Sequence, residues 1–132
     1  MVYKRNEGFR FAFEKPVPAT FKTLSGGRSL GLGGSDSIGH ILDISPRGMK
    51  LATEVDISEH ISKHLQLAIN FVLDTLVIRV TGDIIWRKSY GKSFQYGIKF
   101  TEQPAIEELI ISELKSRRKK EVLQAKKKVK WE

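Results

Sequence analysis

The chain has 132 residues, of which 40% are hydrophobic, no cysteine, and a formal net charge of +8. This length fits one domain with a modest core, and the lack of cysteine excludes disulfides, thiolate metal sites and cysteine nucleophiles. Neither a signal-peptide pattern nor a run of eighteen apolar residues is present, so we expect a cytoplasmic protein without membrane insertion.

The positive charge is concentrated at the C-terminus. Residues 115–132 contain nine Lys and Arg side chains against two Glu, a net of +7, whereas the preceding residues have fourteen basic and thirteen acidic side chains. We therefore expect a domain over residues 1–114, which includes the start of a C-terminal helix, and a basic tail over residues 115–132 that is helical or frayed. Such a charge run either stays solvated or contacts an acidic protein surface, nucleic acid or an anionic membrane.

The N-terminal part of the chain predicts strands and a long loop. From Phe9 the sequence alternates until Pro16 and Pro18 interrupt the pattern, and residues 19–24 form the next expected strand. Residues 25–39 contain six glycines and little to bury, which is typical of a long connection.

The middle of the chain alternates more regularly. Residues 38–44 and 48–53 are two expected strands separated by a Ser-Pro turn signal, and further alternating runs cover residues 65–80 and 94–100. Several short strands with turns between them predict a mainly β protein with an antiparallel sheet closed as a barrel or sandwich. The phenylalanines of these runs and Trp86 are expected in the core.

The period changes to that of a helix after Pro104. Ile106, Leu109, Ile110 and Leu114 then form one apolar stripe that can pack on the barrel. Beyond Leu114 the stripe thins among lysines.

The principal candidate for a functional site is the segment DISPRG, from Asp43 to Gly48. By itself this segment describes a tight turn between strands. Its position relative to other segments makes it a candidate site, because a basic segment containing Arg5 and Arg10 precedes the first strand. The segments GDIIW and YGIKF then follow at strand spacing before the C-terminal helix.

This order resembles the PilZ domain family, whose signatures are an RxxxR motif, often with another Arg just before it, and a D/N-x-S-x-x-G turn. The resemblance covers roughly residues 4–115. It implies a small six-stranded antiparallel β-barrel with a C-terminal α-helix. Asp43, Ser45 and Gly48 match the turn motif in full.

The arginine motif is matched in part. Arg10 aligns with its last arginine, Asn6 with its first, and Arg5 with the additional preceding one. The resemblance implies a receptor for cyclic di-GMP without enzymatic activity. This ligand presents two phosphodiester charges and two guanines, and arginine can form paired hydrogen bonds to phosphate oxygens or to guanine O6 and N7 and can stack on a base. We assign these roles to Arg5 and Arg10, on a segment that folds over the ligand as it binds.

The remaining candidate residues have complementary chemistry. Asp43 is suited to accept the N1 and N2 hydrogens of guanine, and Ser45 can donate or accept at a phosphate or base edge. Gly48 permits close backbone approach or a positive φ. Arg47 either contacts a phosphate or faces solvent, and Asn6 supplies hydrogen bonds without charge.

Two alternatives remain open at this point. Asn6 at an arginine position is compatible with a PilZ-fold module that has a degenerate site, binds no cyclic di-GMP and acts through a protein partner. The tail is a candidate surface for such a partner. Nucleic-acid binding is disfavoured because aromatic residues other than Trp131 are not interleaved with the tail's cations.

Metal binding and catalysis have little support in the sequence. His60 and His64 have the i, i+4 spacing of zinc ligands, but no HExxH motif or third ligand accompanies them, so we expect no metal. No pairing of Ser, His and Asp, or of two carboxylates, has catalytic spacing. Gly97 is expected to serve packing or a β-bulge.

Overall fold

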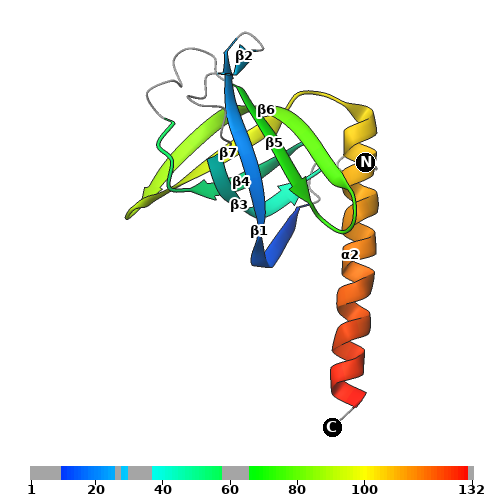
Figure 1. Ribbon diagram of the computed structural model, residues 1–132. Coiled ribbons are helices and arrows are strands. Elements are labelled where there is room, and N and C mark those ends of the chain that lie inside the picture. Colours follow the sequence, from blue (N-terminus) through cyan, green and yellow to red (C-terminus); the bar gives the residue numbers. More distant parts are fainter. Residues whose placement is uncertain (1–9, 26–27, 30–36, 58–65, 131–132) are drawn as a thin grey trace.

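The computed structural model describes residues 10–25, 28–29, 37–57 and 66–130 (Figure 1). These residues form strands and one long helix. In chain order they are β1 (Phe11–Ser25), β2 (Arg28–Ser29), β3 (Ser37–Ser45), β4 (Gly48–Thr53), β5 (Gln66–Val72), β6 (Val77–Tyr90), β7 (Ser93–Phe100) and α2 (Pro104–Lys130).

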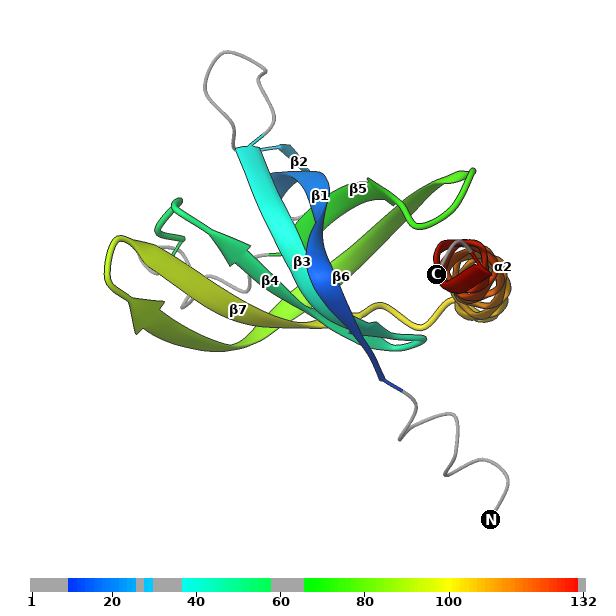
Figure 2. The ribbon, with the colours of Figure 1, turned by 90° about the horizontal axis from the view of Figure 1, so that it is seen from below.

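The strands close into an antiparallel barrel. Their order is β2-β1-β3-β4-β7-β6-β5, and β1 also pairs with β5, from Ala19 opposite Phe71 to Leu24 opposite Gln66. The two-residue β2 only extends the end of β1. The other six strands therefore form the barrel, with α2 lying beside it (Figure 2). This confirms the predicted six-stranded antiparallel β-barrel with a C-terminal helix.

The two prolines do not end the first strand, contrary to the sequence-based expectation. β1 continues through both, but its register with β3 shifts, because Ala12 lies opposite Asp43 and Val17 lies opposite Ile41. Residues 13–16 consequently stand opposite Leu42 alone. A bulge of this kind accommodates Pro16, since its backbone nitrogen has no hydrogen to give to the ladder.

The barrel interior is filled by the inward residues of the alternating runs. Leu67 and Ile69 of β5, Ile78 of β6 and Ile41 of β3 are fully buried. Tyr96 of β7 is also buried, and its hydroxyl accepts the Ile57 amide at 2.8 Å and donates to the Val55 carbonyl at 3.1 Å. The phenylalanine prediction holds for Phe13, Phe21, Phe71 and Phe100, which are buried in this core.

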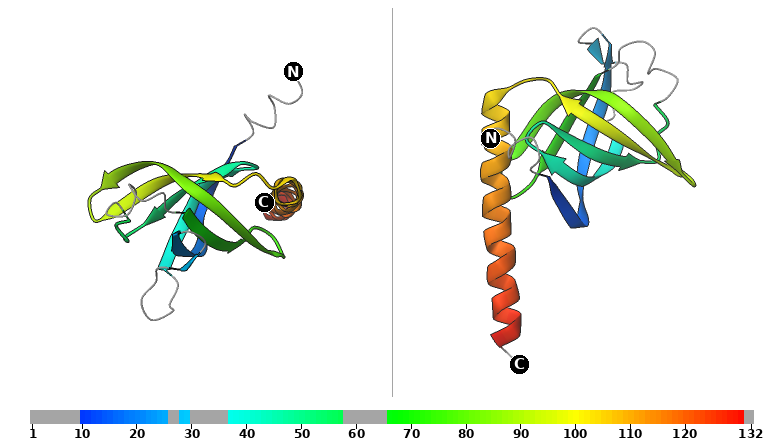
Figure 3. Two further views of the ribbon diagram at one scale, coloured as in Figure 1. Left: turned by 90° about the horizontal axis from the view of Figure 1, so that it is seen from above. Right: turned by 180° about the vertical axis from the view of Figure 1, so that it is seen from behind.

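Helix α2 packs on the side of the barrel through the predicted stripe (Figure 3). Ile110 and Leu114 are buried, and Ile106 and Leu109 pack against the core at its margin. The helix begins at Pro104, as expected from its fixed φ at the first helical position.

Polar contacts fix the middle of α2 to the β5–β6 turn. The carboxylate of Glu113 is buried and accepts the backbone amides of Thr75 and Leu76 at 3.0 and 2.9 Å. Arg117 Nη1 donates to the Leu73 carbonyl at 2.8 Å, and its guanidinium lies 5.0 Å from the Phe13 ring centroid. These contacts hold α2 against the barrel up to residue 117.

The helix then continues to Lys130, through the described part of the basic segment. None of the described residues form a helix long and apolar enough to span a membrane.

Candidate functional site

The DISPRG segment is the tight connection between β3 and β4. Ser45 pairs with Gly48 across the turn, and Pro46 and Arg47 form its tip. Ser45 is buried, and its hydroxyl accepts the Arg47 amide at 3.3 Å and lies 3.4 Å from the Gly48 carbonyl oxygen. The serine therefore holds the turn in shape.

Gly48 is required by the close approach of β4 to β7. A Cβ atom built at this position would lie 2.4 Å from the carbonyl oxygen of Ile98, and this oxygen is part of the backbone and cannot swing away. Among the described glycines the positive φ is found at Gly91, not here. Of the two expected reasons for a glycine at 48, close backbone contact is therefore the one that applies.

Asp43 lies on the outside of the barrel because β3 contains a β-bulge at Leu42. Ile41 is opposite Leu51 and Asp43 is opposite Lys50, so β3 has one additional residue between the two pairs. The bulge shifts the alternation by one residue and turns Asp43 outward beside Lys50.

Two cations converge on the Asp43 carboxylate. Arg10, just before β1, forms an ion pair with it through Nη1, and Lys50 Nζ lies 3.6 Å from Oδ2. The Asp43 side chain is only 12% exposed, whereas that of Arg10 is 51% exposed. Arg10 and Asp43, both predicted from the sequence, are thus brought together, while Lys50 was not predicted.

Trp86 is not in the core, and the expectation from the sequence is wrong on this point. In β6, Ile84 lies opposite Ile98 and Trp86 lies opposite Gly97, which leaves Ile85 as the additional residue of a further bulge. The inward alternation of β6 therefore stops at Ile84, and Trp86 emerges half-buried on the outer face.

The indole of Trp86 lies directly on Gly97. A Cβ atom at Gly97 would be 2.1 Å from Nε1 of Trp86, so only glycine leaves room for the ring in this position. Lys88 Nζ lies 5.7 Å from the centroid of the same ring. The prediction that Gly97 serves packing or a bulge is confirmed on both counts, since it stands opposite the bulge and under the indole.

These residues form a continuous row across four neighbouring strands. Asp43 of β3 is opposite Lys50 of β4, Lys50 is opposite Gly97 of β7, and Gly97 is opposite Trp86 of β6. With a strand spacing near 4.8 Å, the row is about 14 Å long. We call Arg10, Asp43, Lys50, Gly97 and Trp86 the surface row. A cavity of about 190 Å³ lies along it, and Ile85 contributes to the lining.

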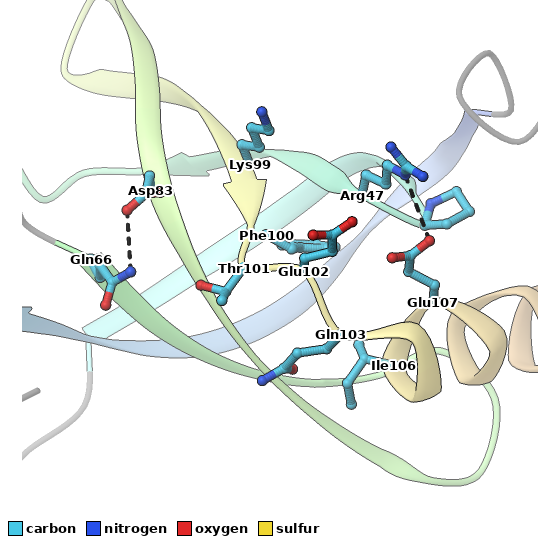
Figure 4. A pocket seen from close by; sticks show the side chains of 11 residues that line it. Arg47, Gln66, Asp83, Lys99, Phe100, Thr101, Glu102, Gln103, Ile106 and Glu107 are labelled. Atoms are coloured by element: carbon cyan, nitrogen blue, oxygen red, sulfur yellow. Dashed lines mark hydrogen bonds and ion pairs between the residues drawn. The ribbon is translucent and has the colours of Figure 1, made fainter. Parts of the chain in front are cut away.

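Arg47 does not belong to the surface row. Its Nε lies 3.6 Å from Oε1 of Glu107 on α2, and it lines a second cavity of about 430 Å³ between the turn, β7 and the start of the helix (Figure 4). Its carbonyl also accepts the Phe100 amide at 2.8 Å. Arg47 therefore connects the DISPRG turn to α2, and the surface row is formed without it.

The other predicted site residues cannot be placed in the same way. Arg5 and Asn6 lie outside the described residues, as do His60 and His64. Within the described part of the chain, no group of three or more His, Asp or Glu side chains is arranged to hold a metal ion.

Comparison with known proteins identifies the family. The pattern of the PilZ domain matches residues 3–116. The chain belongs to the PilZ domain family. Members of this family are non-catalytic receptors for cyclic di-GMP. Among curated proteins, no sequence matches the chain significantly.

Solved PilZ structures share the fold at low sequence identity. The PilZ domain of YcgR from Escherichia coli, solved with cyclic di-GMP, superimposes with a TM-score of 0.65 at 16% identity, covering 90% of this chain and 95% of that one. The PilZ domain of CeSA from a cellulose-synthesizing bacterium has a TM-score of 0.50 at 16% identity, covering 78% of this chain and 91% of that one. These similarities establish the barrel with its C-terminal helix.

Proposed function

We propose that this PilZ domain binds cyclic di-GMP on the surface row. The observation that carries the proposal is that two bulges place an Arg10–Asp43–Lys50 charge cluster and the Trp86 indole on one outer face of the barrel. A cyclic dinucleotide needs cations for its phosphates, a hydrogen-bond acceptor for a guanine edge, and planar groups for its bases. The row offers all three.

Each residue of the row has a role in this proposal. Asp43 accepts the N1 and N2 hydrogens of a guanine, and Arg10 and Lys50 neutralise phosphate. Trp86 gives one base a flat surface, and base–aromatic stacking contributes about 1–3 kcal/mol. In the free protein the Asp43 carboxylate forms an ion pair with Arg10. The ligand replaces this ion pair and contacts both side chains.

The remaining predicted residues act around the row. Ser45 and Gly48 keep the turn in the shape that presents Asp43. Arg5 and Asn6 precede Arg10 on the same segment, and we propose that they close over the ligand and become ordered with it. Ordering the segment costs conformational entropy, which the new phosphate contacts offset.

The signal reaches a protein partner through α2 in this proposal. Arg47 joins the ligand-binding turn to Glu107 in the first turns of the helix. A ligand that moves the turn therefore acts on the position of α2 and on the basic tail that follows it.

Isothermal titration with cyclic di-GMP tests the proposal. The unmodified protein is expected to bind, and Arg10→Ala is expected to weaken binding at least tenfold, because a charge-assisted hydrogen bond contributes about 1.5–3 kcal/mol. Arg79→Ala is the matched control, since Arg79 is an exposed cation of β6 outside the surface row. An absence of heat and of a thermal shift at high micromolar ligand would rule the proposal out.

A second candidate function is supported by Asn6, which stands where the family motif has its first arginine. In this alternative the site is degenerate and the barrel acts only as a protein-interaction module. Asn6→Arg separates the two functions. If the unmodified protein does not bind cyclic di-GMP and Asn6→Arg does, the site has lost an essential charge. If both bind, and the variant about tenfold more tightly, the receptor function stands.

A further inference from the structure

The C-terminal part of α2 leaves the barrel and forms a surface of its own (Figures 1 and 3). Lys120 Nζ contacts Asp74 Oδ1 of the β5–β6 turn at 2.9 Å, and every residue from 118 to 125 is exposed. From residue 120 the helix continues to Lys130, over about 15 Å at 1.5 Å per residue. Figure 1 shows no described strand alongside this part of the helix.

The cations of this part of α2 form two clusters. The first comprises Lys115, Arg117, Arg118, Lys119 and Lys120, and the second comprises Lys126, Lys127, Lys128 and Lys130. Residues 122–125 separate them with the neutral sequence VLQA. Glu121, the acidic residue between the clusters, is paired with Arg117 at 3.4 Å. A neutral segment is thus flanked on both sides by positive charge.

The first cluster surrounds the helix rather than occupying one side of it. Arg117 and Lys120 point to the β5–β6 turn, where both have contacts, whereas Arg118 and Lys119 are exposed. Successive residues of an α-helix are rotated by about 100°, so Lys115, Arg118 and Lys119 lie on a different side of the helix, where they line a hollow beside Phe11 of β1.

This distribution favours a partner that contacts a helix from both sides. A helix lying on a membrane needs one continuous apolar face, and cations on all sides prevent it. An α-helix has a diameter of about 10–12 Å, and the major groove of duplex DNA is about 12 Å wide with a phosphate backbone on each wall. A helix that crosses this groove places its two ends at the two backbones and its middle at the base edges.

From these observations we infer that the projecting part of α2 is a binding site for duplex DNA. The two basic clusters contact the phosphates of the two groove walls, and residues 122–125 face the base edges between them. The glutamine amide and the Ala and Val methyl groups of this neutral segment are suited to adenine and to thymine methyl groups. The lack of interleaved aromatic residues argues against single strands, which are bound by stacking, but not against a duplex.

The helix itself is expected to respond to the DNA. Lys115 and Lys119, and likewise Lys126 and Lys130, stand four residues apart, and like charges at this spacing destabilise a helix in solution. Phosphates on both sides remove this repulsion. Binding should therefore stabilise the helix of the C-terminal segment against heating, which circular dichroism measures. Because this site does not involve the surface row, the test below uses the full chain without cyclic di-GMP, and its result is independent of the receptor function.

The test compares a proline variant with its alanine control. Gln124→Pro and Gln124→Ala have the same charge, and residue 124 lies beyond Lys120, the last of the described side chains of α2 with a contact to the barrel. Both variants should therefore melt as the unmodified protein does. Proline in a helix interior costs about 3 kcal/mol, which breaks the helix between the two clusters. Fluorescence anisotropy with a labelled DNA duplex of mixed sequence, about two turns long, measures binding.

We expect duplex binding that survives at about 0.1 M salt, with a slope of log K against log salt near −4.5 for about five phosphate contacts. Gln124→Pro should weaken it at least tenfold, and Gln124→Ala at most threefold. Equal binding by the proline variant would mean that a flexible polycation suffices and would overturn the inference. Tighter binding to the corresponding single strand, or to phosphatidylserine vesicles, would also overturn it, as would an absence of duplex binding.

Discussion

Two β-bulges, at Leu42 in β3 and at Ile85 in β6, create the two ends of the surface row. Both change the alternation of a strand by one residue and turn the next side chain out of the barrel. The bulge in β3 presents Asp43 with its two cations, and the bulge in β6 presents Trp86 on a glycine. A β-bulge therefore forms each end of the proposed site, one of them charged and the other aromatic.

The two ends differ in how rigidly their glycines are constrained. A side chain at Gly48, in the turn beside Asp43, would collide with the backbone of β7, whereas one at Gly97 would collide with the movable indole of Trp86. The charged end is therefore built into the barrel, and the aromatic end is held by the packing of one side chain. The following predictions test this difference.

The largest effect is expected on stability at Gly48. Gly48→Ala places a methyl group against the Ile98 carbonyl, and the strands must separate to admit it. We expect the free energy of unfolding to fall by about 3 kcal/mol, the upper part of the range for overpacked sites, as measured by urea denaturation. A loss below about 0.5 kcal/mol would show that β4 and β7 adjust easily and would remove the contrast with Gly97.

The next largest effect is expected on ligand affinity at Asp43. Asp43→Ala removes the acceptor for a guanine edge and the counter-charge that holds Arg10 and Lys50 in place. We expect cyclic di-GMP affinity to fall about 30-fold, corresponding to about 2 kcal/mol, in isothermal titration. Asp83→Ala, at an exposed position of β6 outside the surface row, is the control and should bind normally.

Trp86 should contribute less than Asp43. Trp86→Ala is expected to weaken cyclic di-GMP binding about tenfold, because it removes one stacking surface, while Trp86→Phe retains most of the affinity. If Trp86→Ala binds as tightly as the unmodified protein, the ligand occupies only the charged end of the row.

The smallest effect is expected at Gly97. Gly97→Ala should displace the indole without opening the barrel, so the free energy of unfolding falls by at most about 1 kcal/mol. The emission of Trp86 should shift to longer wavelength in a Trp131→Phe background, since the ring becomes more exposed to water. A stability loss as large as that of Gly48→Ala would show that the two ends are equally rigid.

The sequence predicted the architecture well, for a physical reason. The inward residues of β5, such as Leu67 and Ile69, are apolar at every second position, and this periodicity decides which side of a strand faces the core. The helical spacing of the apolar residues up to Leu114 predicted the C-terminal helix equally clearly. The two prolines of β1 misled the prediction because a bulge can absorb a missing amide hydrogen.

From the sequence, only those site residues were predicted whose charge disfavours burial in the core. Asp43 must face solvent or a partner wherever the bulge lies, and the turn motif marks it as well. Trp86 is apolar, and uninterrupted alternation after Ile84 would place it inside, so nothing in its own chemistry reveals the bulge at Ile85. The outward position of Lys50 is predictable as well, because a charged residue between the buried Met49 and Leu51 of β4 must point outward.

The central claim is that cyclic di-GMP lies along the surface row from Asp43 to Trp86. Fluorescence titration of the Trp131→Phe protein tests it most directly, because Trp86 is then the sole tryptophan. Stacking of a guanine on the indole should change the Trp86 emission in a saturable way, with the same midpoint as the heat of binding. Binding heat without any change in Trp86 emission would place the ligand elsewhere on the barrel and contradict the account.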